Sequence, residues 1–188
     1  MPRFSFTTWT GALCTLGVLA GCGGPAPSQK TAANRDQPPA AAVAESPVEL
    51  QVLDYDGLQQ LIAGHKGKVV VMDAWSTSCP PCIKEFPNLV ALQKKHPDRL
   101  AAISLSFDNE GVDALPVVKQ RVTEFLTSQG ATFDNVLSRE ETDDLYEKMK
   151  LAAVPAVFVY DPGGDLVKRF EGTFTYEDVG ELVEGLLK

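Results

Sequence analysis

Two cysteines, Cys79 and Cys82, have two residues between them, and both of these residues are prolines. They follow an apolar run rich in β-branched residues and precede a stretch that predicts a helix, so Cys79 is expected at the helix N-terminus. Unpaired amides and the helix dipole favour negative charge there, which lowers the pKa of a thiol. The thiolate attacks a disulfide, and a second thiol one turn later can close on the mixed disulfide. The spacing therefore predicts a site for thiol-disulfide exchange.

The sequence gives less support to other roles of the cysteine pair. A purely structural disulfide would close too short a loop to stabilise the fold much. A Cys-x-x-Cys pair can bind copper or zinc, but only His65 and His96 are present to complete such a site, and we expect both on the surface. A peroxide reductase needs a Pro-x-x-x-Thr/Ser-x-x-Cys pattern, which Ser76 and Cys79 complete only in part. Copper binding stays as the alternative; no metal or cofactor is expected for disulfide exchange.

Composition sets the broad class. The 188 residues are 44% hydrophobic and 8% aromatic, which is enough for a core and excludes a wholly disordered chain. The net charge is −8, and no segment concentrates the basic residues. A nucleic-acid-binding protein would show a clustered cationic face, so that class is excluded.

The N-terminus has the features of an exported lipoprotein. A short basic start at Arg3 precedes an apolar run over 10–20, which is shorter than the ~20 residues needed to span a bilayer. The run ends in Leu-Ala-Gly-Cys, which resembles the lipobox of bacterial lipoproteins. We therefore expect residues 1–21 to be a cleaved signal peptide and Cys22 to be lipidated. An ordinary signal peptide with an incidental Cys22 is the alternative.

Residues 22–47 are rich in proline and alanine and almost lack large apolar side chains, which predicts a flexible linker. The folded domain is expected over 48–188. Two or more acyl chains hold a protein stably on a membrane. We therefore expect a domain tethered in the bacterial cell envelope and facing the extracytoplasmic side.

The domain alternates predicted strands and helices. Strands are expected at 48–53, 68–75, 100–107 and 133–137, and helices at 58–64 and 80–95. A further helical face is marked by Val118, Val122, Phe125 and Leu126.

The C-terminal third is the clearest part. A hairpin is expected from strands 156–160 and 166–171, and Thr175 can cap a last helix. Ser138 and Glu141 have the spacing of a capping box for the helix before the hairpin. Strands alternating with helices, then a hairpin and a helix, predict a three-layer α/β domain with a mixed sheet.

Over 48–188 the chain resembles the thioredoxin superfamily, in particular its membrane-anchored branch of TlpA- and ResA-like thiol-disulfide oxidoreductases. The resemblance rests on the strand motif Val70–Trp75, the redox helix motif Cys79–Pro87 and the loop Val154–Ala156. The segment 107–130 is similar to the insertion that separates this branch from plain thioredoxin. The resemblance implies a thioredoxin-like three-layer fold with a mixed central sheet and a helical insertion.

The resemblance also implies residue roles. Cys79 corresponds to the attacking cysteine and Cys82 to the resolving one, joined as the redox disulfide. Pro155 corresponds to the family's cis-proline, which receives a substrate strand, with the Val154 backbone offering hydrogen bonds. A trans turn proline is the alternative at this position.

Three further residues complete the expected site. Asp73 matches a buried acid and Glu85 a glutamate associated with proton handling, so both are candidates for proton transfer at the thiols. Trp75 is expected to pack under the site, with substrate contact secondary. The alternatives are a merely structural Asp73 and a solvated Glu85.

The sequence departs from the branch at several positions. Asp73 stands where many members have asparagine, Ser78 where an aromatic residue or threonine is common, and Ala156 where threonine is usual. The resemblance favours a monomeric reductant that acts on client-protein disulfides and is recharged by a membrane electron donor.

Overall fold

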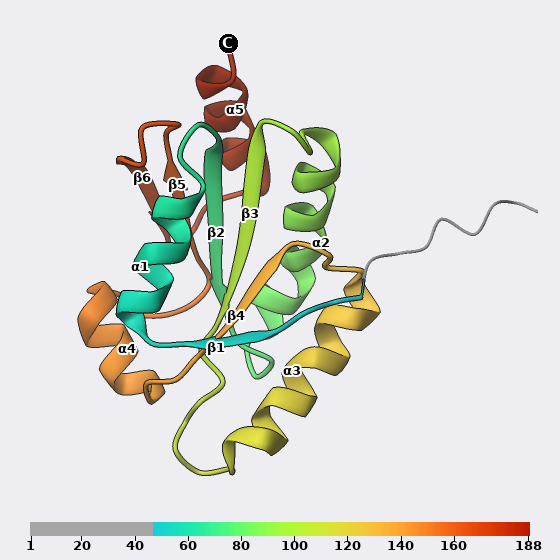
Figure 1. Cartoon of the computed structure of the whole chain (residues 1–188), viewed down its shortest axis with the longest axis vertical. Helices are drawn as coiled ribbons and strands as arrows, with labels where there is room; N and C mark the ends of the chain where they lie inside the picture. Colours follow the sequence, from blue (N-terminus) through green and yellow to red (C-terminus); the bar gives the residue numbers. More distant parts are fainter. Residues whose placement is uncertain (1–46) are drawn as a thin grey trace, which may run out of the picture. The chain divides into compact units, whose positions relative to one another are not determined.

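A six-stranded mixed sheet forms the centre of the computed structural model, which describes residues 47–188 (Figure 1). The predicted signal peptide, Cys22 and nearly all of the predicted linker lie outside these residues. The strand order is β1-β4-β3-β2-β5-β6. The strands are β1 (Gln51–Leu53), β2 (Val69–Trp75), β3 (Leu100–Ser106), β4 (Asp134–Ser138), β5 (Ala156–Tyr160) and β6 (Leu166–Glu171).

The central strands are β2 and β3, and every residue of both is buried. They run parallel, with Val69 beside Leu100 and Trp75 beside Ser106. Their apolar sequences suit strands covered on both faces. The strands β1, β4, β3 and β2 are parallel to their neighbours, whereas β5 is antiparallel to β2 and β6 to β5. The predicted mixed sheet is confirmed.

Helices cover both faces of the sheet and make three layers (Figure 1). One face packs against α1 (Tyr55–Gly64) and α4 (Thr142–Met149). The other packs against α2 (Pro80–Lys95), α3 (Leu115–Gln129) and α5 (Tyr176–Leu186). The predicted three-layer α/β fold is therefore confirmed.

The predicted insertion contributes α3 and the turn that follows it. This helix buries Val118, Val122 and Leu126 against the sheet, as their spacing predicted. The chain then forms β4, which lies between β1 and β3.

The two predicted helix caps have different outcomes. Thr175 caps α5 in a full capping box, in which its hydroxyl accepts from the Asp178 N–H and Asp178 accepts from the Thr175 backbone. The capping box predicted for Ser138 and Glu141 is wrong. Ser138 pairs with Leu53 as the last residue of β4, so α4 begins later, and Glu141 occupies its N-cap without a side-chain hydrogen bond.

Within residues 47–188, no helix combines the length and apolar character needed to cross a bilayer.

Candidate active site

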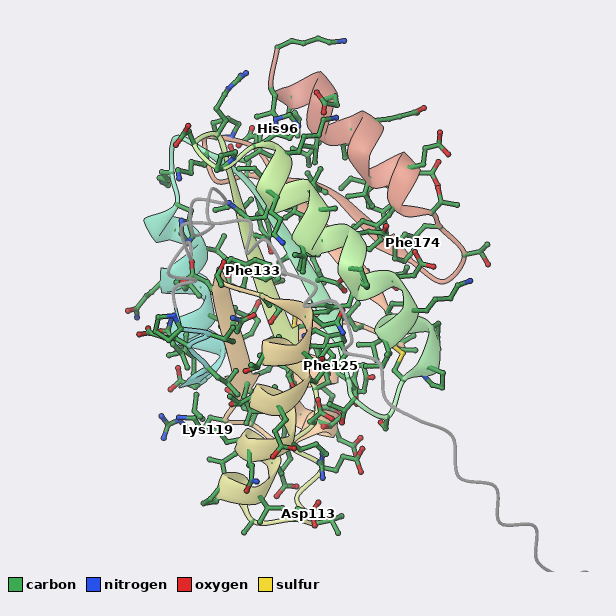
Figure 2. The ribbon with its side chains drawn as sticks, turned by 90° about the vertical axis from the view of Figure 1, so that its right-hand side faces the viewer. His96, Asp113, Lys119, Phe125, Phe133 and Phe174 are labelled. Carbon is green, nitrogen blue, oxygen red and sulfur yellow. A yellow bond between two sulfur atoms is a disulfide. The ribbon has the colours of Figure 1, made fainter. Side chains whose placement is uncertain are left out.

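The two cysteines form a disulfide at the N-terminus of α2, at the end of that helix opposite His96 (Figure 2). Cys79 is the N-cap residue, and its Sγ accepts a hydrogen bond from the Cys82 N–H at 3.3 Å. Pro80 and Pro81 fill the first helical positions without N–H groups of their own. The Cys82 amide is therefore aimed at the Cys79 sulfur, where it can stabilise a thiolate once the disulfide is reduced.

The two sulfurs differ in access. The Cys82 side chain is buried, with 2% of the residue exposed, and it packs with Trp75 and Phe86. Cys79 is half-buried. Only Cys79 is therefore open to a protein-sized partner.

The Val154–Pro155 loop lies beside Cys79. The peptide bond between these two residues is cis, as the resemblance implied. The Val154 carbonyl oxygen is 3.8 Å from Cys79 Sγ, and both loop residues are half-buried. The structure thus brings Cys79, Val154 and Pro155 together at one surface.

Trp75 lies beneath this surface and is fully buried. Its ring contacts Phe86 at 5.0 Å and Phe125 at 4.7 Å between centroids, joining β2, α2 and α3. Phe125 lies on α3 beside α2 (Figure 2). The expectation of packing agrees with this position. Its secondary role as a substrate-binding residue is not supported, because no part of the ring reaches the surface.

Asp73 is buried on the same face of β2, with 3% exposed. Burial raises the pKa of Asp73 to about 7, and the negative charge of Glu85 adds to this, while a hydrogen bond from the Tyr176 hydroxyl opposes it. Tyr176 is the first residue of α5. The carboxyl of Asp73 can therefore gain and lose a proton near neutral pH.

Glu85 lies on the redox helix, three residues after Cys82. It is half-buried, and its carboxylate accepts a hydrogen bond from the Asn88 amide at 2.9 Å. It makes no hydrogen bond with Asp73 among the described residues and acts on it through charge. The predicted pair of carboxyl groups is thus close enough to interact.

Asp108, which lies two residues after the end of β3, was not predicted as a site residue. Its buried carboxylate accepts hydrogen bonds from the Thr77 N–H at 3.0 Å, the Ser76 hydroxyl at 3.2 Å and the Ser106 hydroxyl at 2.6 Å, and also from the Thr77 hydroxyl. Asp108 therefore holds the loop that leads into Cys79. Its position in the sequence could have predicted this role. Asp108 follows one predicted strand and Cys79 follows the adjacent one, and the carboxyl ends of adjacent parallel strands meet at one edge of a sheet.

No three His, Cys, Asp or Glu side chains come together as a metal site in the part of the chain that the structure describes. His65 instead contacts Asp134 at 2.8 Å, and His96 contacts Glu184 at 2.7 Å. The copper-binding alternative is therefore not favoured.

Comparison with known proteins agrees with this geometry. The model of the Redoxin family matches residues 33–186. The chain is 27% identical over 151 residues to the thiol-disulfide oxidoreductase ResA of Geobacillus thermodenitrificans, covering 78% of this chain and 79% of that protein. It is 33% identical over 127 residues to ResA of Bacillus subtilis, covering 65% and 63% respectively.

The fold has a similar solved structure in a DsbF homologue from Corynebacterium diphtheriae. The TM-score is 0.54 at 19% sequence identity, covering 66% of this chain and 76% of the other. This likeness supports the thioredoxin-like fold.

Proposed function

The chain belongs to the Redoxin family and is a thioredoxin-like thiol-disulfide oxidoreductase of the ResA type, and we propose that Cys79 and Cys82 are its redox centre. One observation carries the proposal: the half-buried Cys79 sulfur sits at a helix N-terminus and accepts the Cys82 N–H, while Cys82 is shielded. This asymmetry supports attack by Cys79 and resolution by Cys82.

The exchange reaction starts from the reduced protein. The Cys79 thiolate attacks one sulfur of a client disulfide; that bond breaks, a mixed disulfide forms, and the second client sulfur leaves as a thiolate. Cys82 then loses its proton and attacks the Cys79 sulfur, which releases the first client sulfur. The client disulfide gains two electrons and becomes two thiols, and the pair Cys79–Cys82 is oxidised.

In this scheme Asp73 accepts the Cys82 proton. Asp73 and Trp75 lie on the face of β2 that packs against α2, and Cys82 packs with Trp75 in that layer. A carboxyl whose pKa is raised to about 7 by burial can both accept and return a proton at neutral pH. Glu85 tunes this proton through its negative charge.

The Val154–Pro155 loop is the proposed docking edge for the client. The Val154 carbonyl oxygen lies beside the Cys79 sulfur. A client strand that pairs with this backbone would therefore place its own sulfur next to Cys79. Clients are disulfide-bearing proteins, which agrees with the name thiol-disulfide oxidoreductase that the relatives carry.

We further propose that the enzyme works outside the bacterial cytoplasm. The proposal rests on the lipobox-like sequence before Cys22, which makes 1–21 the signal peptide, 22–47 the lipidated linker and 48–188 the redox domain. The working direction is reduction, with a membrane electron donor and a monomeric enzyme, as the resemblance implies.

The centre is tested by insulin reduction with the full chain. Cys79→Ser should abolish turnover, and Cys82→Ser should accumulate a mixed disulfide with insulin because the resolving thiol is gone. Equilibration with glutathione buffers then tests the direction. A reductant should have a potential nearer about −270 mV than about −120 mV, the values of thioredoxin and of a strong oxidant.

Cys14→Ser is the matched control, since it removes a cysteine outside the proposed centre. It should reduce insulin at the parental rate. Turnover by Cys79→Ser, or trapping by that variant and not by Cys82→Ser, would refute the assignment of the two thiols.

A further inference from the structure

Tyr176 connects the start of α5 to the buried acid of the redox centre. The capping box of Thr175 and Asp178 fixes the helix start, which makes Tyr176 the first helical residue. Its hydroxyl donates a hydrogen bond to Asp73 Oδ2, across 103 positions of sequence. Among the described residues, this hydroxyl is the only hydrogen-bond donor to the Asp73 side chain. One phenol thus supplies all of the polar contacts recorded for this carboxyl.

The remaining surroundings of Asp73 offer no replacement. Its neighbours in the sheet are Ser104 of β3 and Val157 of β5, and the Ser104 hydroxyl donates to Asn135 instead. The titratable groups that act on the Asp73 carboxyl are Glu85 of α2 and Tyr176 of α5. Of these two, Glu85 repels the ionised carboxyl, whereas Tyr176 favours it through a hydrogen bond.

Tyr176 also faces a surface cavity. It is half-buried and lines a cavity of about 270 Å³ between α2 and α5. The cavity is walled by Asn88, Ala91, Leu92, Lys95, Tyr176 and Glu177. Asp73 is buried and is not part of this wall.

We propose that Tyr176 is a positioning residue of the exchange reaction: its hydroxyl holds the Asp73 carboxyl and sets the pH range in which Asp73 accepts the Cys82 proton. The inference rests on the proposed function, because it presumes that Asp73 is the proton acceptor. Tyr176 touches neither sulfur in this role and acts through Asp73.

The expected direction follows from which form of Asp73 the phenol favours. A donor to a carboxylate stabilises the ionised form and lowers its pKa. Removing the hydroxyl therefore raises the pKa of Asp73 further above its ordinary value. Closure by Cys82 then requires a higher pH, because the base is ionised in a smaller fraction of molecules near neutrality.

The full-length protein carrying Cys14→Ser and Cys22→Ser, so that Cys79 and Cys82 are its only thiols, can be reduced and mixed with dithiobis-nitrobenzoate in a stopped-flow instrument. Attack by Cys79 releases the first thionitrobenzoate, and closure by Cys82 on the Cys79 sulfur releases the second and forms the internal disulfide. The second phase reports the Cys82 step alone. Tyr176→Phe should move the pH midpoint of this phase up by about one unit and slow it about fivefold near pH 7, leaving the first phase unchanged.

Three further variants make the result decisive. Tyr160→Phe is the matched control, since Tyr160 is a buried tyrosine of β5 on the opposite face of the sheet, and it should leave both phases at parental rates. Asp73→Asn should slow the second phase and flatten its pH profile. Adding Tyr176→Phe to Asp73→Asn should change nothing more, because the phenol acts through that carboxyl.

The outcomes separate the two claims. If Asp73→Asn slows closure but Tyr176→Phe shifts no midpoint, the inference about Tyr176 is overturned and the role of Asp73 stands. If Tyr176→Phe slows both phases equally, the phenol is structural and the inference is again overturned. If Asp73→Asn closes at the parental rate, the proposed proton acceptor itself is wrong.

Discussion

Asp73 is a carboxyl group buried in the central sheet. A buried acid is unfavourable when ionised, and within residues 47–188 the Tyr176 hydroxyl is its one hydrogen-bond donor. The pKa of Asp73 rises from its ordinary value of 3.8 to about 7, mainly because of burial. Between these values the folded chain keeps a proton that the unfolded chain has lost, so stability falls as the pH rises.

Asp73→Asn should therefore stabilise the protein in a pH-dependent manner. We expect the free energy of unfolding to rise by roughly 2–4 kcal/mol near pH 8 and by little near pH 3, where both states of the parent are largely protonated. Urea unfolding at the two pH values measures this difference. An equal effect at both would show that the pKa of Asp73 is not raised in the native state.

Hydrogen bonds from the end of β3 position the loop that precedes α2. The Asp108 carboxylate accepts hydrogen bonds from the Thr77 amide and from the hydroxyls of Ser76 and Ser106. The Phe107 N–H also donates to the Trp75 carbonyl at 2.8 Å, so the ends of β2 and β3 are bonded directly. The N-terminus of the redox helix is thus anchored to the sheet through buried polar contacts.

Asp108→Ala should destabilise the protein by about 2–4 kcal/mol, because it leaves several buried donors without an acceptor. It should also broaden the pH dependence of Cys79 alkylation as the loop loosens. Asp113→Ala is the matched control, since Asp113 is exposed and its contact with Arg121 at 2.9 Å is a surface ion pair. Chemical denaturation of both variants provides the comparison; similar losses would refute an anchoring role for Asp108.

Local sequence patterns predicted the bounds of some helices and strands and misplaced others. The bounds of α2, β5 and β6 were predicted as observed, because prolines and a Pro-Gly turn mark their ends. The helix cap at Ser138 was misplaced because strand pairing with β1 took that residue.

The site was likewise predictable only in part. Cys79, Cys82 and Pro155 are recognisable from spacing and family motif. The partners Tyr176 and Asp108 are joined to the site by contacts across 103 and 31 positions, which no local pattern encodes.

The sequence predicts two further segments N-terminal to the domain that the structure describes. The sequence predicts a lipid anchor at Cys22, a proline- and alanine-rich linker and then the domain described by the structure. Two or more acyl chains are sufficient for stable attachment to a membrane. Confinement near a membrane would hold the enzyme close to the proposed membrane electron donor and limit the clients that it meets.

Cys22→Ser should abolish metabolic labelling with a fatty acid and leave the precursor uncleaved, because that thiol is the predicted acceptor of the lipid. Mass spectrometry and membrane fractionation of cells making the protein measure both effects. Cys14→Ser, which changes a cysteine of the predicted signal peptide, should be labelled and processed normally. Normal membrane retention of Cys22→Ser would contradict the predicted anchor.

The shielding of Cys82 also directs oxidative damage to one sulfur. A peroxide that reaches the reduced centre meets Cys79 first, because Cys79 is half-buried whereas Cys82 is only 2% exposed. The resulting sulfenic acid lies next to a thiol with which it can condense, releasing water and forming the internal disulfide. Irreversible sulfinic acid at Cys79 is thereby disfavoured, and oxidation ends in the same Cys79–Cys82 disulfide that the structure contains.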